Sequence, residues 1–171
     1  MPPRRAVLGG LTAAFAIGLG RGARAATLPA PTGKAILTLR GKIGLRNAGD
    51  VARFDLAMQD ALPPGRFEGE TPWTRGRTVF TGPLAAAVLD AVAASGANLR
   101  VNALNDYDAD IPAADFRDHA VILATRRDGA VMSIRGKGPI WVIYPMDKEP
   151  ALRIETIYTR SVWQVSGIEV G

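Results

Sequence analysis

The chain has 171 residues, of which 21 are basic, 16 are acidic and none is cysteine. This length suits one compact domain behind a short leader, and the missing cysteines exclude disulfides, thiolate nucleophiles and thiolate metal ligands. The formal charge of +5 is concentrated at the front, because four of the arginines lie in residues 1–25. The remainder holds 17 basic and 16 acidic groups, which argues against binding nucleic acid or an anionic membrane through charge alone.

Residues 1–25 are typical of a removable export signal. Arg4 and Arg5 precede the small apolar run 6–19, and Ala23 and Ala25 suit a cleavage site of small residues. The paired arginines favour the twin-arginine route, although an ordinary secretory signal would also carry positive charge here. Residues 26–171 are then expected to form a single periplasmic domain with no membrane insertion after cleavage, since no later stretch is long and apolar enough to span a bilayer.

The elements expected after the signal are mostly strands. A first strand at 35–40 is followed by residues 51–62, which suit a strand entering a short helix that Pro63-Pro64-Gly65 ends. A strand at 78–82 leads into the clearest helix, 83–95, which has an apolar stripe and Gly96 as its C-terminal cap. Further strands are expected at 99–103, 121–125, 131–134, 140–144, 154–158 and 165–170, with a hairpin turn at Arg127-Asp128-Gly129. This order predicts an α+β, mainly β fold of mixed sheets with few short helices, rather than a parallel doubly wound sheet.

Four sequence landmarks, in a fixed order, resemble a known family. They are Trp73–Gly76 with Phe80–Leu84, then Asp106–Pro112, then Gly138–Pro145, and finally Ser161–Trp163 with Ile168–Val170. Together they resemble the molybdopterin-binding domain of the sulfite oxidase superfamily over about residues 36–170. The resemblance implies the α+β fold of that domain for nearly the whole exported chain.

The chain departs from this family at the residues that serve the cofactor. The family's molybdenum enzymes ligate their metal through a cysteine thiolate, which this chain does not have. The resemblance also implies that Trp141 and Trp163 stand where those enzymes tend to carry an arginine and a lysine. An indole does not neutralise a phosphate, but its flat face suits a pterin, a purine or another planar heterocycle.

The same combination resembles a subgroup of small exported proteins with this fold that bind pterins and have no metal-ligating cysteine. Those proteins are associated with membrane sensory enzymes that make or degrade cyclic di-GMP, and segments 103–107 and 160–164 carry this likeness. It implies a periplasmic, non-catalytic protein whose pterin or molybdopterin-like ligand is reported to such a membrane enzyme, with no protein-ligated molybdenum. A molybdopterin-dependent oxidoreductase without the cysteine ligand stays open as the alternative, as does a domain that only docks onto a partner.

Six residues are candidates for contacting the ligand: Trp73, Asn105, Tyr107, Trp141, Arg160 and Trp163. The three indoles supply flat faces, although Trp141 and Trp163 lie in apolar segments where tryptophan usually belongs to the core. Asn105 offers a donor and an acceptor to a pterin edge, or else holds a turn with Asp106. Tyr107 matches the family's active-site tyrosine. The Arg160 guanidinium would donate two hydrogen bonds to a carbonyl or a phosphate of the ligand, or else stay solvated at the surface.

No metal site is expected from the sequence. Asp106, Asp108 and Asp110 alternate as in a calcium loop, but Ile111 stands where that loop needs glycine. His119 is the single histidine, which excludes a cluster of histidine ligands, and a structural role is expected for it.

Overall fold

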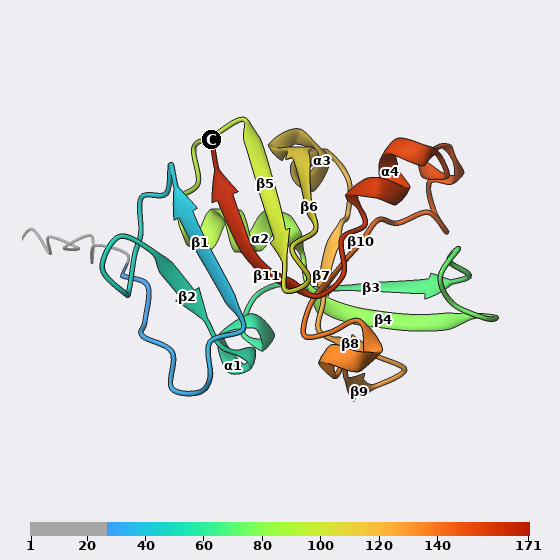
Figure 1. The fold of residues 1–171 in the computed structure, drawn as a ribbon, viewed down its shortest axis with the longest axis horizontal. Helices are drawn as coiled ribbons and strands as arrows, with labels where there is room; N and C mark the ends of the chain where they lie inside the picture. The colour runs from blue at the N-terminus through green and yellow to red at the C-terminus, as the bar shows by residue number, and fades with distance from the viewer. Residues whose placement is uncertain (1–26) are drawn as a thin grey trace, which may run out of the picture.

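A computed structural model describes residues 27–171, and the expected export signal at residues 1–25 lies outside them. The described chain is a mixed α+β structure made mostly of strands with a few short helices (Figure 1). This confirms the α+β, mainly β class predicted from the order of the expected elements. Within the described residues, no helix combines the length and the apolar character needed to cross a membrane.

The largest sheet has five strands in the order β2-β1-β11-β5-β6. Their bounds are β1 Leu37–Gly41, β2 Ala52–Phe54, β5 Asn98–Ala103, β6 Asp108–Pro112 and β11 Val165–Val170. Only the pair β1–β11 is parallel, while the other neighbours are antiparallel, so the sheet is mixed as predicted. Figure 1 shows the C-terminal strand β11, in red, between β1 and β5.

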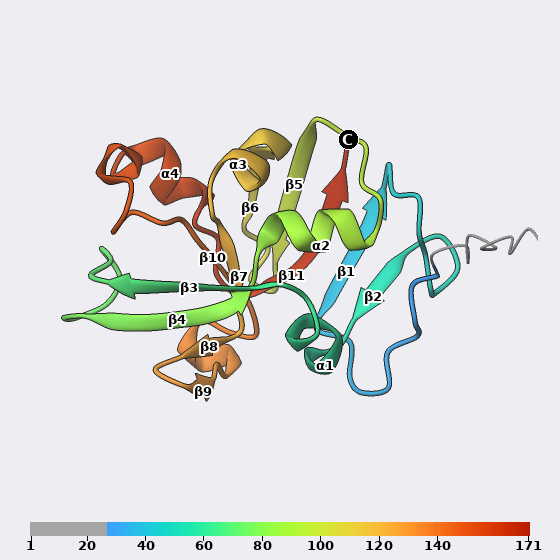
Figure 2. The ribbon, with the colours of Figure 1, turned by 180° about the vertical axis from the view of Figure 1, so that it is seen from behind.

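Short helices cover one face and the ends of this sheet. They are α1 Leu56–Asp60, α2 Ala85–Ala91, α3 Ala113–Asp118 and α4 Glu155–Arg160. Figure 2 shows α2 lying across the back of the sheet, where Ala85, Val88 and Leu89 are buried. The buried side chains of α2 therefore close the core on that face.

A second sheet has four strands in the order β3-β4-β8-β9 and is built on a long hairpin. Its strands are β3 Pro64–Gly69, β4 Thr78–Pro83, β8 Arg126–Arg127 and β9 Ala130–Val131. The predicted turn between β8 and β9 is confirmed, because Asp128 and Gly129 both have positive φ, 50° and 82°, as a type I′ hairpin turn requires. In Figure 1 the hairpin of β3 and β4 extends away from the larger sheet, with its connecting loop 70–77 at the far end.

A buried two-stranded sheet joins these parts. It pairs β7 Ile122–Ala124 with β10 Trp141–Ile143, and all six of these residues are buried. The 3-10 turns η1 Ile134–Gly136 and η2 Pro150–Leu152 flank β10 in sequence. Trp141, Tyr144 and Phe80 are among the largest side chains that are fully buried here.

The structure differs from the sequence-based expectation in several segments. Residues 154–158, predicted as a strand, lead into and form most of α4, in which Ile157 is the buried residue. The expected strand at 131–134 is reduced to the end of β9, and η1 follows it. The helix predicted at 83–95 is shorter, because α2 ends at Ala91 and a left-handed backbone at Ala93, with φ of 50°, stops it before Gly96.

Candidate functional site

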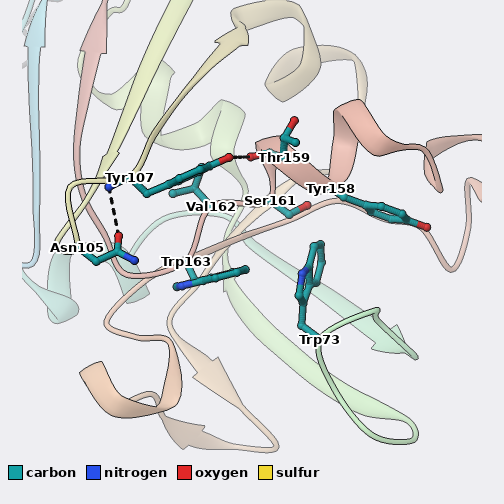
Figure 3. A pocket seen from close by; sticks show the side chains of 8 residues that line it. All are labelled: Trp73, Asn105, Tyr107, Tyr158, Thr159, Ser161, Val162 and Trp163. Atoms are coloured by element: carbon teal, nitrogen blue, oxygen red, sulfur yellow. Dashed lines mark hydrogen bonds between the residues drawn. The ribbon is translucent and has the colours of Figure 1, made fainter.

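A cavity of about 270 Å³ lies where three regions that are distant in sequence meet, and we call it the aromatic cavity. Its lining residues are Trp73, Asn105, Tyr107, Tyr158, Thr159, Ser161, Val162 and Trp163 (Figure 3). Trp73 comes from the loop between β3 and β4, and Asn105 and Tyr107 come from the loop between β5 and β6. The other five come from the end of α4 and the segment that leads into β11. Four of the six candidate residues are therefore brought together on one opening.

Edge-to-face contacts hold the indoles of the cavity. The ring centroid of Trp73 lies 5.7 Å from that of Tyr158 and 6.2 Å from that of Trp163, at interplanar angles of 85° and 68°. Aromatic rings prefer such arrangements because the positive edge of one ring meets the negative face of another. Figure 3 shows the rings of Tyr107 and Trp163 on opposite sides of the open space.

Trp141 is placed beneath this opening rather than on its wall. Its side chain is fully buried, and its Nε1 donates a hydrogen bond to the carbonyl oxygen of Ser161 at 3.1 Å. Its ring lies 5.2 Å from that of Phe80 and 6.0 Å from that of Trp163. Trp141 therefore supports the cavity from the core and is not among its lining residues.

Lys137 places a cation against these indoles. Its Nζ lies 3.6 Å from the ring centroid of Trp163 and 5.3 Å from that of Trp141, which is cation–π geometry. Burial of the ammonium group lowers the pKa of Lys137 below its usual value. Lys137 is not a lining residue of the cavity, and nothing in its sequence context singles it out.

The loop between β5 and β6 is tied to α4 through Tyr107. The Tyr107 hydroxyl donates to the carbonyl oxygen of Thr159 at 2.8 Å. The backbone N–H of Tyr107 donates to Oδ1 of Asn105 at 3.4 Å, so this amide holds the turn as one of the two sequence hypotheses expects. Tyr107 remains 44% exposed, which leaves one side of its ring accessible.

Three non-glycine residues with a left-handed backbone adjoin the cavity: Asp106 with φ of 64°, Lys137 with 73° and Gln164 with 55°. Gln164 links the segments that flank Trp163, since its N–H donates to the carbonyl of Lys137 at 3.0 Å and its carbonyl accepts from Leu104 at 2.9 Å. Its side-chain Nε2 donates to the carbonyl of Ile134 at 2.8 Å. Sparsely populated backbone conformations cost about 1–3 kcal/mol each and concentrate at functional sites. Their gathering here marks the cavity as the candidate site.

Arg160 is not among the lining residues, because its guanidinium is used elsewhere. Its Nη1 donates to Oδ2 of Asp115 at 2.9 Å, and the Tyr144 hydroxyl donates to the same oxygen at 2.8 Å. Burial and the neighbouring Asp115 carboxylate raise the pKa of Tyr144 above its usual value. The network joins α4 to α3 and to the segment after β10, so it positions the helix that carries part of the cavity.

The lining residues Tyr158, Thr159, Ser161 and Val162 are not among the six sequence candidates, and the strand expected at 154–158 is a helix instead. A charge signal for a helix was present, with Glu155 in the first turn and Arg160 in the last, the order that the helix dipole favours. The helix ends at Arg160, and the chain leaving it supplies the rest of the wall.

The acidic and histidine side chains considered in the sequence lie outside the aromatic cavity. Among residues 27–171, no group of three or more His, Cys, Asp or Glu side chains is placed to hold a metal ion. Asp108 pairs with Arg100 at 2.8 Å on the larger sheet. Nδ1 of His119 lies 2.6 Å from Oε2 of Glu149, which joins the segment after α3 to the turn before η2.

Compared with models of protein families and with curated proteins, the chain has no match. The geometry of the aromatic cavity therefore carries the functional interpretation.

Proposed function

We propose that the protein is a non-catalytic binding protein for a planar, pterin-like heterocycle held in the aromatic cavity. The observation that carries this proposal is the convergence of Trp73, Tyr107 and Trp163, from three separate segments, on one opening. Stacking of a heterocyclic base on an aromatic side chain contributes about 1–3 kcal/mol per ring. Two such faces around one ligand would give useful affinity without any covalent chemistry.

The size of the cavity supports a small ligand. Its volume of about 270 Å³ lies just below the roughly 300–1,000 Å³ that is typical of sites for drug-sized molecules. A bicyclic ring with short substituents suits this space better than a dinucleotide.

The lining supports an uncharged ring. None of the eight lining residues is Lys, Arg, His, Asp or Glu. The guanidinium of Arg160 is paired with Asp115, and the ammonium of Lys137 stands over the Trp163 ring. The phosphate of molybdopterin requires a cationic partner, and the chain has no thiolate for molybdenum. The residues present therefore fit a pterin without phosphate better than molybdopterin. The oxidoreductase alternative retains the sequence resemblance and the twin-arginine type of export signal in its favour.

The proposal includes the fold of the sulfite oxidase molybdopterin-binding domain. The mixed, mainly β architecture agrees with it, and three of the four sequence landmarks, at Trp73, Asp106–Pro112 and Ser161–Trp163, contribute to or adjoin one cavity. Landmarks that are spread over the chain and meet at one place favour a shared site over chance similarity.

We further propose a periplasmic location and a membrane partner, such as a cyclic di-GMP cyclase or phosphodiesterase, that reads the ligand state. Leu104 and Ile134, which are 50% and 53% exposed, lie on the two segments that Gln164 ties together beside Trp163. These two exposed side chains would form part of the contact with the partner. Ligand binding would act by shifting the population of loop conformations on this surface.

The test uses protein exported by its own signal and purified without denaturation. Small molecules are released with acid and identified by mass spectrometry, and molybdenum is assayed in the same sample. A pterin without stoichiometric molybdenum is the expected result. Molybdopterin with molybdenum would favour the oxidoreductase, and a protein that carries no pterin and binds none would contradict the proposal.

A further inference from the structure

Most polar groups around the aromatic cavity are already bonded within the protein. Oγ of Ser161 donates to the carbonyl of Ile157 at 2.8 Å, and Oγ1 of Thr159 donates to the carbonyl of Thr156 at 2.8 Å. The hydroxyl of Tyr107 donates to the carbonyl of Thr159. These hydroxyl protons are therefore not available to a ligand, although each oxygen keeps a lone pair that can accept. Donors to the ligand's edge must come from other groups.

Four polar groups of the lining side chains have no hydrogen-bond partner among residues 27–171: Nε1 of Trp73, the Tyr158 hydroxyl, Nδ2 of Asn105 and Nε1 of Trp163. The last two are both N–H donors. Oδ1 of Asn105 accepts a hydrogen bond from the backbone N–H of Tyr107. The other end of the amide, Nδ2, therefore faces the cavity. Figure 3 shows Nδ2 of Asn105 and Nε1 of Trp163 at the same end of the cavity, beside the loop that carries Asn105. The end of the cavity thus presents a pair of donors.

We infer that Asn105 Nδ2 and Trp163 Nε1 together bind a carbonyl oxygen on the edge of the ligand, so that the cavity selects an oxo-heterocycle over its amino analogue. This inference rests on the proposed function and specifies the chemistry of the ligand. A carbonyl oxygen has two lone pairs and accepts from both donors at once. An amino group at the same position would point its own N–H bonds toward these two donors, which would then have no acceptor.

The loss of such hydrogen bonds decides specificity more strongly than ring shape does. Pterin and 2,4-diaminopteridine have the same bicyclic frame and stack equally well, but the second carries an amino group in place of the ring carbonyl. A site that hydrogen-bonds a substrate group discriminates strongly against an analogue that lacks the group. Because Asn105 is exposed, water lowers the penalty, and we expect a preference of about tenfold rather than the far larger ratios of closed sites.

The experiment measures Kd by calorimetry for pterin and for 2,4-diaminopteridine on the purified exported protein and on three variants. Asn105→Asp keeps an oxygen for the Tyr107 N–H but replaces the Nδ2 donor with an acceptor, so the preference for pterin should fall to parity or invert. Trp163→Phe keeps an aromatic face and removes the Nε1 donor, so the preference should fall with a smaller loss of total affinity.

Asp106→Asn is the matched control in the same loop. Asp106 does not line the cavity, and asparagine tolerates its left-handed backbone, so the variant changes one charge without touching the donor pair. It should retain the preference for pterin.

The outcomes separate the donor-pair inference from the proposed function. Equal affinity of the unaltered protein for the two pteridines would overturn the donor-pair inference and leave the proposed function standing. A preference that survives in both Asn105→Asp and Trp163→Phe, each checked for folding by circular dichroism, would overturn it as well. Binding of neither pteridine would contradict the proposed function itself.

Discussion

Trp141 and Trp163 are neighbours across an isolated antiparallel bridge, yet they lie in different environments. Trp141 is fully buried, with its N–H bonded to Ser161 and Phe80 packed edge-to-face against it. Trp163 is half-buried, lines the aromatic cavity and has an indole N–H without an acceptor in the described part of the chain. A tryptophan whose ring and N–H are both satisfied by the protein serves the core, whereas one with an unpaired N–H beside a cavity is available to a ligand.

The largest expected effect is on stability, from Trp141→Ala. Removing this side chain leaves a cavity beneath three aromatic rings and deprives the Ser161 carbonyl of its donor, so the free energy of unfolding should fall by about 3–5 kcal/mol. Urea unfolding followed by circular dichroism measures it. A loss no larger than that caused by Trp163→Ala would remove the distinction between the two indoles.

Trp163→Ala should have its main effect on binding. Loss of one stacking face, worth about 1–3 kcal/mol, raises the Kd for pterin by about fivefold to about 150-fold, with a smaller change in stability than Trp141→Ala causes. Calorimetric titration measures it, and Val131→Ala, at an exposed apolar residue outside the cavity, is the control. An unchanged Kd would mean that the ligand does not lie on Trp163.

Arg160→Met separates a structural arginine from a ligand contact. The variant leaves Asp115 mostly buried with only the Tyr144 hydroxyl as its partner, which should lower the free energy of unfolding by about 1–3 kcal/mol. The Kd for pterin should change by less than about threefold, since Arg160 does not line the cavity. A large loss of affinity in a variant of intact stability would restore Arg160 as a ligand contact.

The smallest expected effect is the pH dependence that Asp55 gives to stability, far from the cavity. Backbone N–H groups of Met58, Gly33 and Thr32 donate to its carboxylate and hold its pKa below the usual 3.8. Because the folded pKa is depressed, this stabilisation is present above pH 3.8 and is lost as the pH falls through the folded value.

Asp55→Asn should therefore flatten the acid side of the stability profile. The test compares urea midpoints of the two proteins at neutral pH and at pH values below about 4, the unperturbed range of an aspartate. Parallel profiles would show that this carboxylate does not contribute to the acid sensitivity of the fold.

Much of the fold follows from local patterns. The apolar alternation of 165–170 predicts β11 with its observed bounds, and Asp128-Gly129 predicts its hairpin because both residues tolerate positive φ. The strand predicted at 154–158 is wrong. Ile154, Ile157 and Tyr158 also have the spacing of one helix face, and the charges of Glu155 and Arg160 at the two ends favour a helix. β6 was not predicted because its aspartates favour turns, and only its place at the edge of the larger sheet accommodates them.

The sequence predicts four of the residues that line the cavity but not the other four. Trp73, Asn105, Tyr107 and Trp163 line one cavity, a convergence that the sequence alone does not show. The roles of the other candidates depend on partners that are distant in sequence: Phe80 covers Trp141, and Asp115 takes the guanidinium of Arg160. Lys137 reaches the indoles through a left-handed bend that no local signal predicts.

The most direct test of the central claim uses the three tryptophans of the chain as reporters. In a ¹⁵N-labelled protein each indole N–H gives its own NMR signal, and substitution of each tryptophan in turn assigns them. On addition of pterin, the Trp163 signal should move and the Trp141 signal, bonded to the Ser161 carbonyl, should stay nearly fixed. If no indole signal moves, or if Trp141 moves and Trp163 does not, the aromatic cavity is not the binding site.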